Sequence, residues 1–155
     1  MPLGNKGQMA QEAATRAVVE KFVKYWGVQD IAQTVALHAD DAVSKVHFDH
    51  SEVGMSGEVC GREKIAEGLY ANLAMWHYLR FEPTIMSFEG DTGRIHIDFE
   101  YQHAQTKLLF ASTQRMIVVV KDGLLTRIDS YHDVEKVAAF MRMLRWHMDN
   151  PLQNA

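Results

Sequence analysis

Apolar residues in the first half of the chain recur every three or four positions, which predicts helices. A first helix is expected over residues 9–26, where the repeat consists of Ala14, Val18, Phe22 and Tyr25. Asp30 can cap a second, shorter helix that runs to His38. A third helix is expected over residues 62–76, because one stripe along it contains Ile65, Leu69, Leu73 and Trp76.

After the third helix the period of the pattern changes to two, which predicts strands. Four consecutive strands are expected at 80–88, 94–103, 107–120 and 124–132. A weaker alternation at 42–48 predicts one earlier strand, and Asp133 is placed to cap a closing helix that ends before Pro151. The sequence therefore predicts an α+β fold, with a cone-shaped, curved antiparallel sheet packed on three or four helices.

Parity along these strands separates an inner face, toward the helices, from an outer face. The inner face contains Ile95, Ile97, Phe99 and Tyr101, and the polar residues of the same parity are His103, Ser112, Gln114, Ser130 and His132. An apolar interior with a few polar groups is typical of a small-molecule site. Alternatively, these polar groups satisfy one another or the backbone.

One strand is apolar on both faces at its far end. The residues from Met116 to Val120 form an unbroken apolar run, so the outer side of the sheet needs a cover there as well. A second subunit is the simplest cover, and we therefore expect a homodimer.

Composition indicates one domain, which we place at residues 9–150 behind a flexible tail at 1–8. The chain has 155 residues, 47% of them hydrophobic, which suffices for one core. Lys and Arg number 16 against 20 for Asp and Glu, and a net negative surface without a basic run disfavours nucleic acid and anionic membranes as partners. No stretch reaches the roughly 20 apolar residues of a membrane span, and no secretory signal is visible. We therefore expect a cytoplasmic protein, and the lone Cys60 excludes an internal disulfide.

Two histidines near the end of the first strand are candidates for a general base. His47 and His50 flank Asp49, whose carboxylate could orient either imidazole. If the even-numbered residues of this strand face inward, His50 joins them and His47 lies outside, whereas one β-bulge reverses the assignment. Both could equally be solvated loop histidines. A metal would need a third ligand such as His103 or His132, and because no spacing matches a ligand signature we expect no metal.

Four short strings occur in a recognisable order along the chain. They are ADDAV at 39–43, LYANL at 69–73, DFEYQ at 98–102 and DGLLTRIDSYHD at 122–133. Together they resemble the nuclear transport factor 2-like superfamily, and in particular its ketosteroid isomerase and SnoaL-type polyketide cyclase branches. The resemblance implies a strongly bent sheet around a long helix, a mostly apolar pocket open at one end, and frequent dimers.

The resemblance to ketosteroid isomerases assigns their catalytic positions to Phe22, Gln114 and either Val46 or, after a slip of one residue, His47. Phe22 stands where those enzymes use a tyrosine, so steroid isomerisation by their route is not expected. Gln114 can still donate to an oxyanion through its amide, and His47 could act as a base near neutral pH.

The sequence thus predicts a SnoaL-like protein that binds a small hydrophobic carbonyl compound, polyketide- or steroid-like, and catalyses isomerisation, cyclisation or dehydration by proton transfer without a cofactor. In this hypothesis His47 or His50 is the base and Gln114 polarises the carbonyl. The predicted substrate contacts are Phe22, Trp76, Phe99, Tyr101, Phe110, Ser112, Ser130 and His132. Two alternatives remain, a non-catalytic ligand-binding module and a dimeric scaffold whose interior is filled by its own side chains.

Overall fold

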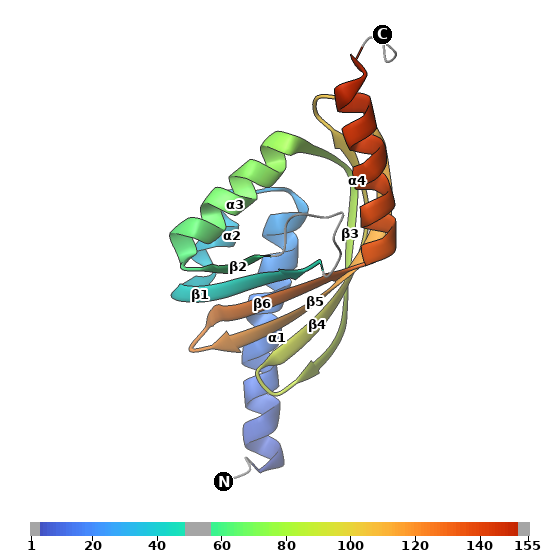
Figure 1. The fold of residues 1–155 in the computed structure, drawn as a ribbon. Helices are drawn as coiled ribbons and strands as arrows, with labels where there is room; N and C mark the ends of the chain where they lie inside the picture. Colours follow the sequence, from blue (N-terminus) through green and yellow to red (C-terminus); the bar gives the residue numbers. More distant parts are fainter. Residues whose placement is uncertain (1–3, 49–56, 152–155) are drawn as a thin grey trace.

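The computed structural model describes residues 4–48 and 57–151. Its elements follow one another in the order α1 (Asn5–Gly27), α2 (Ile31–Ala36), β1 (His38–His47), β2 (Gly57–Cys60), α3 (Arg62–Met75), β3 (Trp76–Glu89), β4 (Thr92–His103), β5 (Leu109–Lys121), β6 (Leu124–His132) and α4 (Val134–Asp149). The strands form one curled sheet; α1 and α3 pack on its inner face, and α4 extends from one end (Figure 1). The predicted α+β fold is confirmed.

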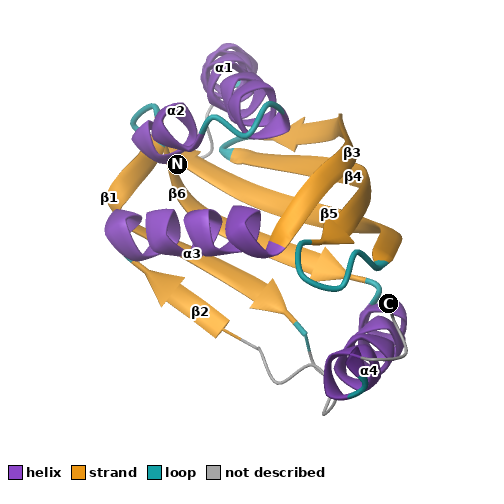
Figure 2. Cartoon of the chain, turned by 90° about the horizontal axis from the view of Figure 1, so that it is seen from above, coloured by secondary structure: helices purple, strands orange, loops and turns teal. Residues whose placement is uncertain are grey.

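The sheet has the strand order β2-β1-β6-β5-β4-β3. Strands β3 to β6 form the predicted antiparallel meander, but β1 runs parallel to β6, with Val46 opposite Ser130 and His47 opposite Tyr131. Alternation along a strand indicates which face is buried but not the direction of its neighbour, so the parallel pair could not be predicted from it. Register shifts in three of the strand pairs accompany the curl of the sheet seen in Figure 2.

The helices begin where the caps predict, with one exception. The carboxylate of Asp30 accepts from the backbone N–H of Gln33 at 3.1 Å, and Asp133 accepts from that of Lys136 at 3.2 Å. The exception is α1, which begins at Asn5 rather than at residue 9, so the prediction of a tail was wrong for residues 5–8. Extending an existing helix costs much less than nucleating one, and the polar first turn therefore needs no apolar periodicity of its own.

Trp76, predicted as the end of the third helix, is instead the first residue of β3. It lies opposite His103 on β4, and two positions later Tyr78 lies opposite Tyr101, with the two rings stacked at 4.1 Å. Cross-strand aromatic pairs stabilise a sheet, and helical periodicity cannot show that Trp76 and Tyr78 have these distant partners on β4. The first strand is likewise longer than predicted and begins at His38.

The inner face of the sheet is filled largely by the protein's own side chains. Phe22 of α1 belongs to the same buried cluster as Ile95, Phe99 and Met116, and Phe99 is only 1% exposed. Such interiors pack as densely as organic crystals, so little room is left for a ligand among these side chains. Among the described residues, none of the helices is long and apolar enough to span a membrane.

Candidate functional site

Three polar side chains lie together on the inner face, near the end of the sheet that carries α4. Gln114 of β5 lies opposite His132 of β6, and Ser112 is two residues from Gln114 on the same face of β5. Opposite and diagonal positions in an antiparallel pair have Cβ atoms about 5–8 Å apart, so one small molecule can reach all three. We call Ser112, Gln114 and His132 the interior polar patch.

The interior polar patch has unused hydrogen-bonding capacity. Ser112 Oγ and His132 Nδ1 are buried and have no hydrogen-bond partner among the described residues. Burial lowers the pKa of His132 from 6.5 to about 4, which keeps the imidazole neutral near pH 7. Because buried polar atoms in native proteins are nearly always paired, these two atoms are candidates for contact with a ligand or an ordered water.

Aromatic rings surround the interior polar patch. The ring of His132 stacks on Phe48 at 5.0 Å and meets the ring of Phe99 edge-on at 6.0 Å. Phe99 in turn meets Phe110 at 5.8 Å. A full charge would lose its hydration against these rings without gaining an opposite charge from the patch, so the surroundings favour an uncharged ligand.

Three other predicted contact residues lie around these rings. Ser130 is buried on β6 opposite Met116. The ring of Tyr101 stacks on Phe99 at 4.2 Å, and burial raises the pKa of its phenol. Trp76 lies 6.4 Å from the ring of Tyr101, ring centre to ring centre. Phe110, Trp76 and Tyr101 thus belong to one aromatic wall beside the patch.

Phe22 lies in the main core. Its ring meets His38 edge-on at 6.2 Å, and burial is the main cause that lowers the pKa of His38. His38 Nδ1 is already bonded to the carbonyl oxygen of Thr34 at 2.9 Å. Neither Phe22 nor His38 is joined to the interior polar patch by a ring contact or hydrogen bond recorded among the described residues.

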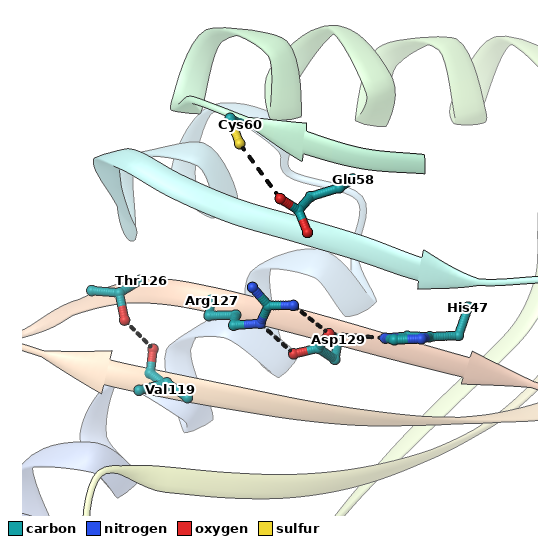
Figure 3. A network of polar contacts seen from close by, with 7 residues as sticks. All are labelled: His47, Glu58, Cys60, Val119, Thr126, Arg127 and Asp129. Carbon is teal, nitrogen blue, oxygen red and sulfur yellow. Dashed lines mark hydrogen bonds and ion pairs between the residues drawn. The ribbon is translucent and has the colours of Figure 1, made fainter. Parts of the chain in front are cut away.

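His47 lies on the outer face of the sheet, in a polar network with Arg127 and Asp129 (Figure 3). Its Nε2 is 2.9 Å from Asp129 Oδ1, and Arg127 donates to both oxygens of the same carboxylate at 2.8 and 3.1 Å. The imidazole also stacks on Tyr131 at 4.2 Å. We call His47, Arg127 and Asp129 the outer network.

The position of His47 decides between the two sequence-based assignments of the first strand. Val46 pairs with Ser130 on the inner face, and no bulge in the described part of β1 after Val43 reverses the alternation. The structure therefore places His47 away from Gln114 and the interior polar patch. His50 and Asp49 lie outside the described residues.

Two surface hollows are lined by described residues. One, of about 220 Å³, is lined by His96, Thr113, Gln114, Arg115, Tyr131, His132 and Asp133. The other, of about 340 Å³, lies where α1 meets the β5–β6 turn and is lined by residues including Thr15, Asp91 and Asp122.

Sequence reasoning missed Phe48 and Phe140 as members of the aromatic surroundings. Phe48 shares the inward parity of Val46, which was a usable signal. Phe140 lies three residues after Val137 and four before Leu144, and this helical spacing also marks it as a member of the buried stripe. In the described ranges, no group of three or more His, Cys, Asp or Glu side chains is arranged to hold a metal ion.

Comparison with known proteins places this geometry in a family. The family model of the SnoaL-like domain matches residues 19–128. The chain belongs to the SnoaL-like family. This membership confirms the resemblance expected from the four sequence strings, whereas no curated protein sequence matches the chain.

Solved structures share the fold at low sequence identity. An NTF2-like protein from Burkholderia xenovorans is 18% identical, with a TM-score of 0.68 over 83% of this chain and 95% of that one. A protein from Mesorhizobium loti, provisionally named a SnoaL-like polyketide cyclase, is 16% identical with a TM-score of 0.65 over 75% and 97% of the two chains. TerC, co-crystallised with polyporic acid, is 14% identical with a TM-score of 0.70 over 83% and 98%.

Proposed function

We propose that this SnoaL-like protein binds a small, uncharged, largely aromatic carbonyl compound at the interior polar patch. The observation that carries the proposal is the pair of buried, unpartnered atoms, Ser112 Oγ and His132 Nδ1. Leaving such atoms unpaired costs about 1–3 kcal/mol each. A ligand hydroxyl or carbonyl that pairs with them recovers that free energy, while Phe48, Phe99 and Phe110 contact its rings.

The chemistry that suits this site is proton transfer without a cofactor. The neutral imidazole of His132 accepts a proton from the carbon next to the ligand carbonyl, and the electron pair moves to the carbonyl oxygen. The Gln114 amide, which forms no hydrogen bond with another described residue, then donates to that oxygen. In an isomerisation, His132 returns the proton to a different atom of the ligand. In a cyclisation, the enolate carbon instead forms a bond to a second carbonyl carbon of the ligand, and His132 returns the proton to the oxygen of that carbonyl. In other enzymes one such donor contributes about 3 kcal/mol to transition-state stabilisation.

The comparisons support the ligand class of this proposal. One structural neighbour was crystallised with polyporic acid, and another carries the name of a polyketide cyclase. At these identities the neighbours bear on the fold, and the residues of the interior polar patch have to carry the argument for this chain. The substrate itself, polyketide- or steroid-like, is part of the proposal.

Binding of a neutral aromatic alcohol tests the proposal directly. We expect 2-naphthol to bind the wild-type protein, as measured by its fluorescence and by ligand-observed NMR. His132→Ala should weaken this binding at least tenfold, because it removes both the nitrogen that hydrogen-bonds the ligand and one ring of the aromatic wall. His47→Ala is the matched control on the outer face and should leave binding unchanged. Absence of binding to the wild type, or equal loss in both variants, would contradict the proposal.

A dimeric scaffold is the second candidate function, and the filled interior favours it. Phe22, Phe99 and Met116 lie in one buried cluster, and Ile117 and Val119 on the outer face are only half-buried in the single chain. A second copy would cover these two residues. Light scattering should then give a dimer mass for the wild type, and Ile117→Lys should shift it to the monomer.

The lone Cys60 fits a reducing compartment, and we place the protein in the cytoplasm.

A further inference from the structure

Phe140 lies at the end of the sheet that carries the interior polar patch. Only Asp133 separates the end of β6 from the start of α4, so this helix begins beside His132. The buried stripe of α4 consists of Val137, Ala138, Phe140 and Leu144. Within that stripe Phe140 is 6% exposed, although α4 extends from the rest of the molecule (Figure 1).

A series of contacts between aromatic rings connects Phe140 to the interior polar patch. The ring of Phe140 stacks on Phe110 at 4.7 Å, Phe110 meets Phe99 at 5.8 Å, and Phe99 meets His132 at 6.0 Å. Phe140 also lies 5.8 Å from Trp76, ring centre to ring centre. Phe140 is therefore the outermost ring of the aromatic wall, and it comes from a different element than the strands that carry the patch.

The register of the strands shows what Phe140 covers. Trp76 is the first residue of β3 and lies opposite His103, the last residue of β4, while Phe110 is the second residue of β5 and lies opposite Tyr101. Three strand ends thus meet at one level, and the Phe140 ring packs over them. A ligand bound to Ser112 and His132 that extends past Phe110 meets this ring.

The residues around α4 that would contact such a ligand are apolar, so they would select it by its shape and not by hydrogen bonds. Val137 and Ala138 form a second buried cluster, against which the partly buried Phe48, Phe110 and Met141 pack, and Phe110 also packs against the main core. A wall of rings and methyl groups discriminates ligands mainly by size, because it rejects what does not fit and gains little from added polar groups.

We propose that Phe140 is the specificity-determining residue of the interior ligand site. It sets the length of ligand that can reach Ser112 and His132, and so selects compact aromatic alcohols and ketones over elongated ones. This inference rests on the proposed function, because it concerns ligands bound at the same patch.

Two neutral aromatic alcohols of different length test the inference in the full chain. The compact probe is 2-naphthol and the longer probe is 2-anthrol, whose additional ring extends in line away from the hydroxyl, with dissociation constants measured by fluorescence. We expect the wild type to prefer 2-naphthol. Phe140→Ala should shift the ratio of the two dissociation constants at least tenfold toward 2-anthrol, since it removes the ring at the end of the site.

Matched variants separate specificity from a general loss of packing. Met143→Ala changes a residue of the same helix whose side chain is 42% exposed, and it should leave the ratio unchanged. Phe140→Leu keeps an apolar side chain if the alanine variant folds poorly, and it should shift the ratio in the same direction. A purely structural role for Phe140 would weaken both probes together.

The outcomes distinguish this inference from the proposed function. If the wild type binds 2-naphthol and His132→Ala abolishes it, while the Phe140 variants leave the ratio unchanged, the specificity role is wrong and the proposed function stands. If neither probe binds the wild type or any variant, both are overturned.

Discussion

His47 is the last residue of β1 and His132 the last residue of the neighbouring strand β6. The two histidines differ in whether the protein supplies a hydrogen-bond partner for the imidazole. His47 pairs with Tyr131 across β1 and β6, so its ring and that of His132 lie on opposite faces of the sheet. In the outer network, the carboxylate of Asp129 is bonded to His47 Nε2 and to Arg127. The interior polar patch around His132 leaves two atoms unpaired. A histidine bonded to a charged side chain of the protein is suited to stability, and one whose buried nitrogen is unpaired is suited to binding.

The largest expected effect is on kcat, which should fall when the interior polar patch is changed and not when the outer network is changed. For any substrate that the protein converts, Gln114→Ala should reduce kcat about a hundredfold, because it removes the donor to the developing oxyanion. His132→Ala should reduce it by a similar factor or more, since general-base catalysis contributes about 10²–10⁴-fold. Steady-state kinetics with matched circular dichroism spectra give the comparison.

His47→Ala is the control for these rates and should keep turnover within a factor of about three, as a residue outside the site. A rate that falls with His47 and survives the loss of His132 would reverse the assignment of the two regions.

The buried, neutral His132 should make the free energy of unfolding depend on pH in mildly acidic solution. Folded His132 stays neutral down to about pH 4, whereas the unfolded chain takes up a proton near pH 6.5. Between these values the unfolded state binds more protons than the folded state. The free energy of unfolding therefore decreases as the pH is lowered through this window, by up to about 3 kcal/mol. Below the window this group causes no further loss.

Urea unfolding at several pH values in the window measures this dependence. The wild type should lose stability between about pH 6.5 and 4, and His132→Phe should lose correspondingly less. Identical pH profiles for the two proteins would mean that His132 is not buried in its neutral form.

Much of the fold followed from the sequence, because the periodicity of α3 and of β4 to β6 reports directly on burial. The inner polar residues Ser112, Gln114 and His132 were found from parity alone. The role of His47 could not be settled, since a single bulge would have moved it to the other face. Its partners Arg127 and Asp129 are about 80 residues away in sequence, and a parallel pairing of β1 with β6 was needed to bring them together. Phe140 is likewise far in sequence from Phe110 and Trp76, so the contacts between these rings could not be predicted either.

A smaller effect is expected from the outer network. The hydrogen bonds of Arg127, and then that of His47, lower the pKa of Asp129, so the network stabilises the fold above the ordinary pKa of an aspartate and loses this contribution as the pH falls through the lowered value. Asp129→Asn should destabilise the protein by about 1–2 kcal/mol at pH 7. Chemical denaturation measures this change.

The matched control for Asp129 is Glu89→Gln, which breaks the exposed ion pair with Arg94. Such surface pairs contribute about 0–1 kcal/mol, so this variant should be close to the wild type. Equal effects of the two substitutions would show that the outer network has no special role in stability.

The smallest effect is expected at Ser112, and its sign is the informative part. Ser112→Ala removes an unpaired buried hydroxyl, so the ligand-free protein should become more stable by about 1 kcal/mol. The same change should weaken binding of 2-naphthol severalfold. Thermal melts without ligand and titrations with it give the two numbers; a loss of stability without ligand would show that the hydroxyl has a partner after all.

The imidazole nitrogens of His132 provide the most direct measurement of the central claim, that the interior polar patch binds a neutral ligand while the outer network does not. With the protein labelled with ¹⁵N in its histidine rings, NMR follows His132 and His47 during a titration with 2-naphthol. The His132 nitrogen resonances should shift to saturation and those of His47 should stay in place. Shifts confined to His47, or no shift of either residue while 2-naphthol binds, would contradict the account.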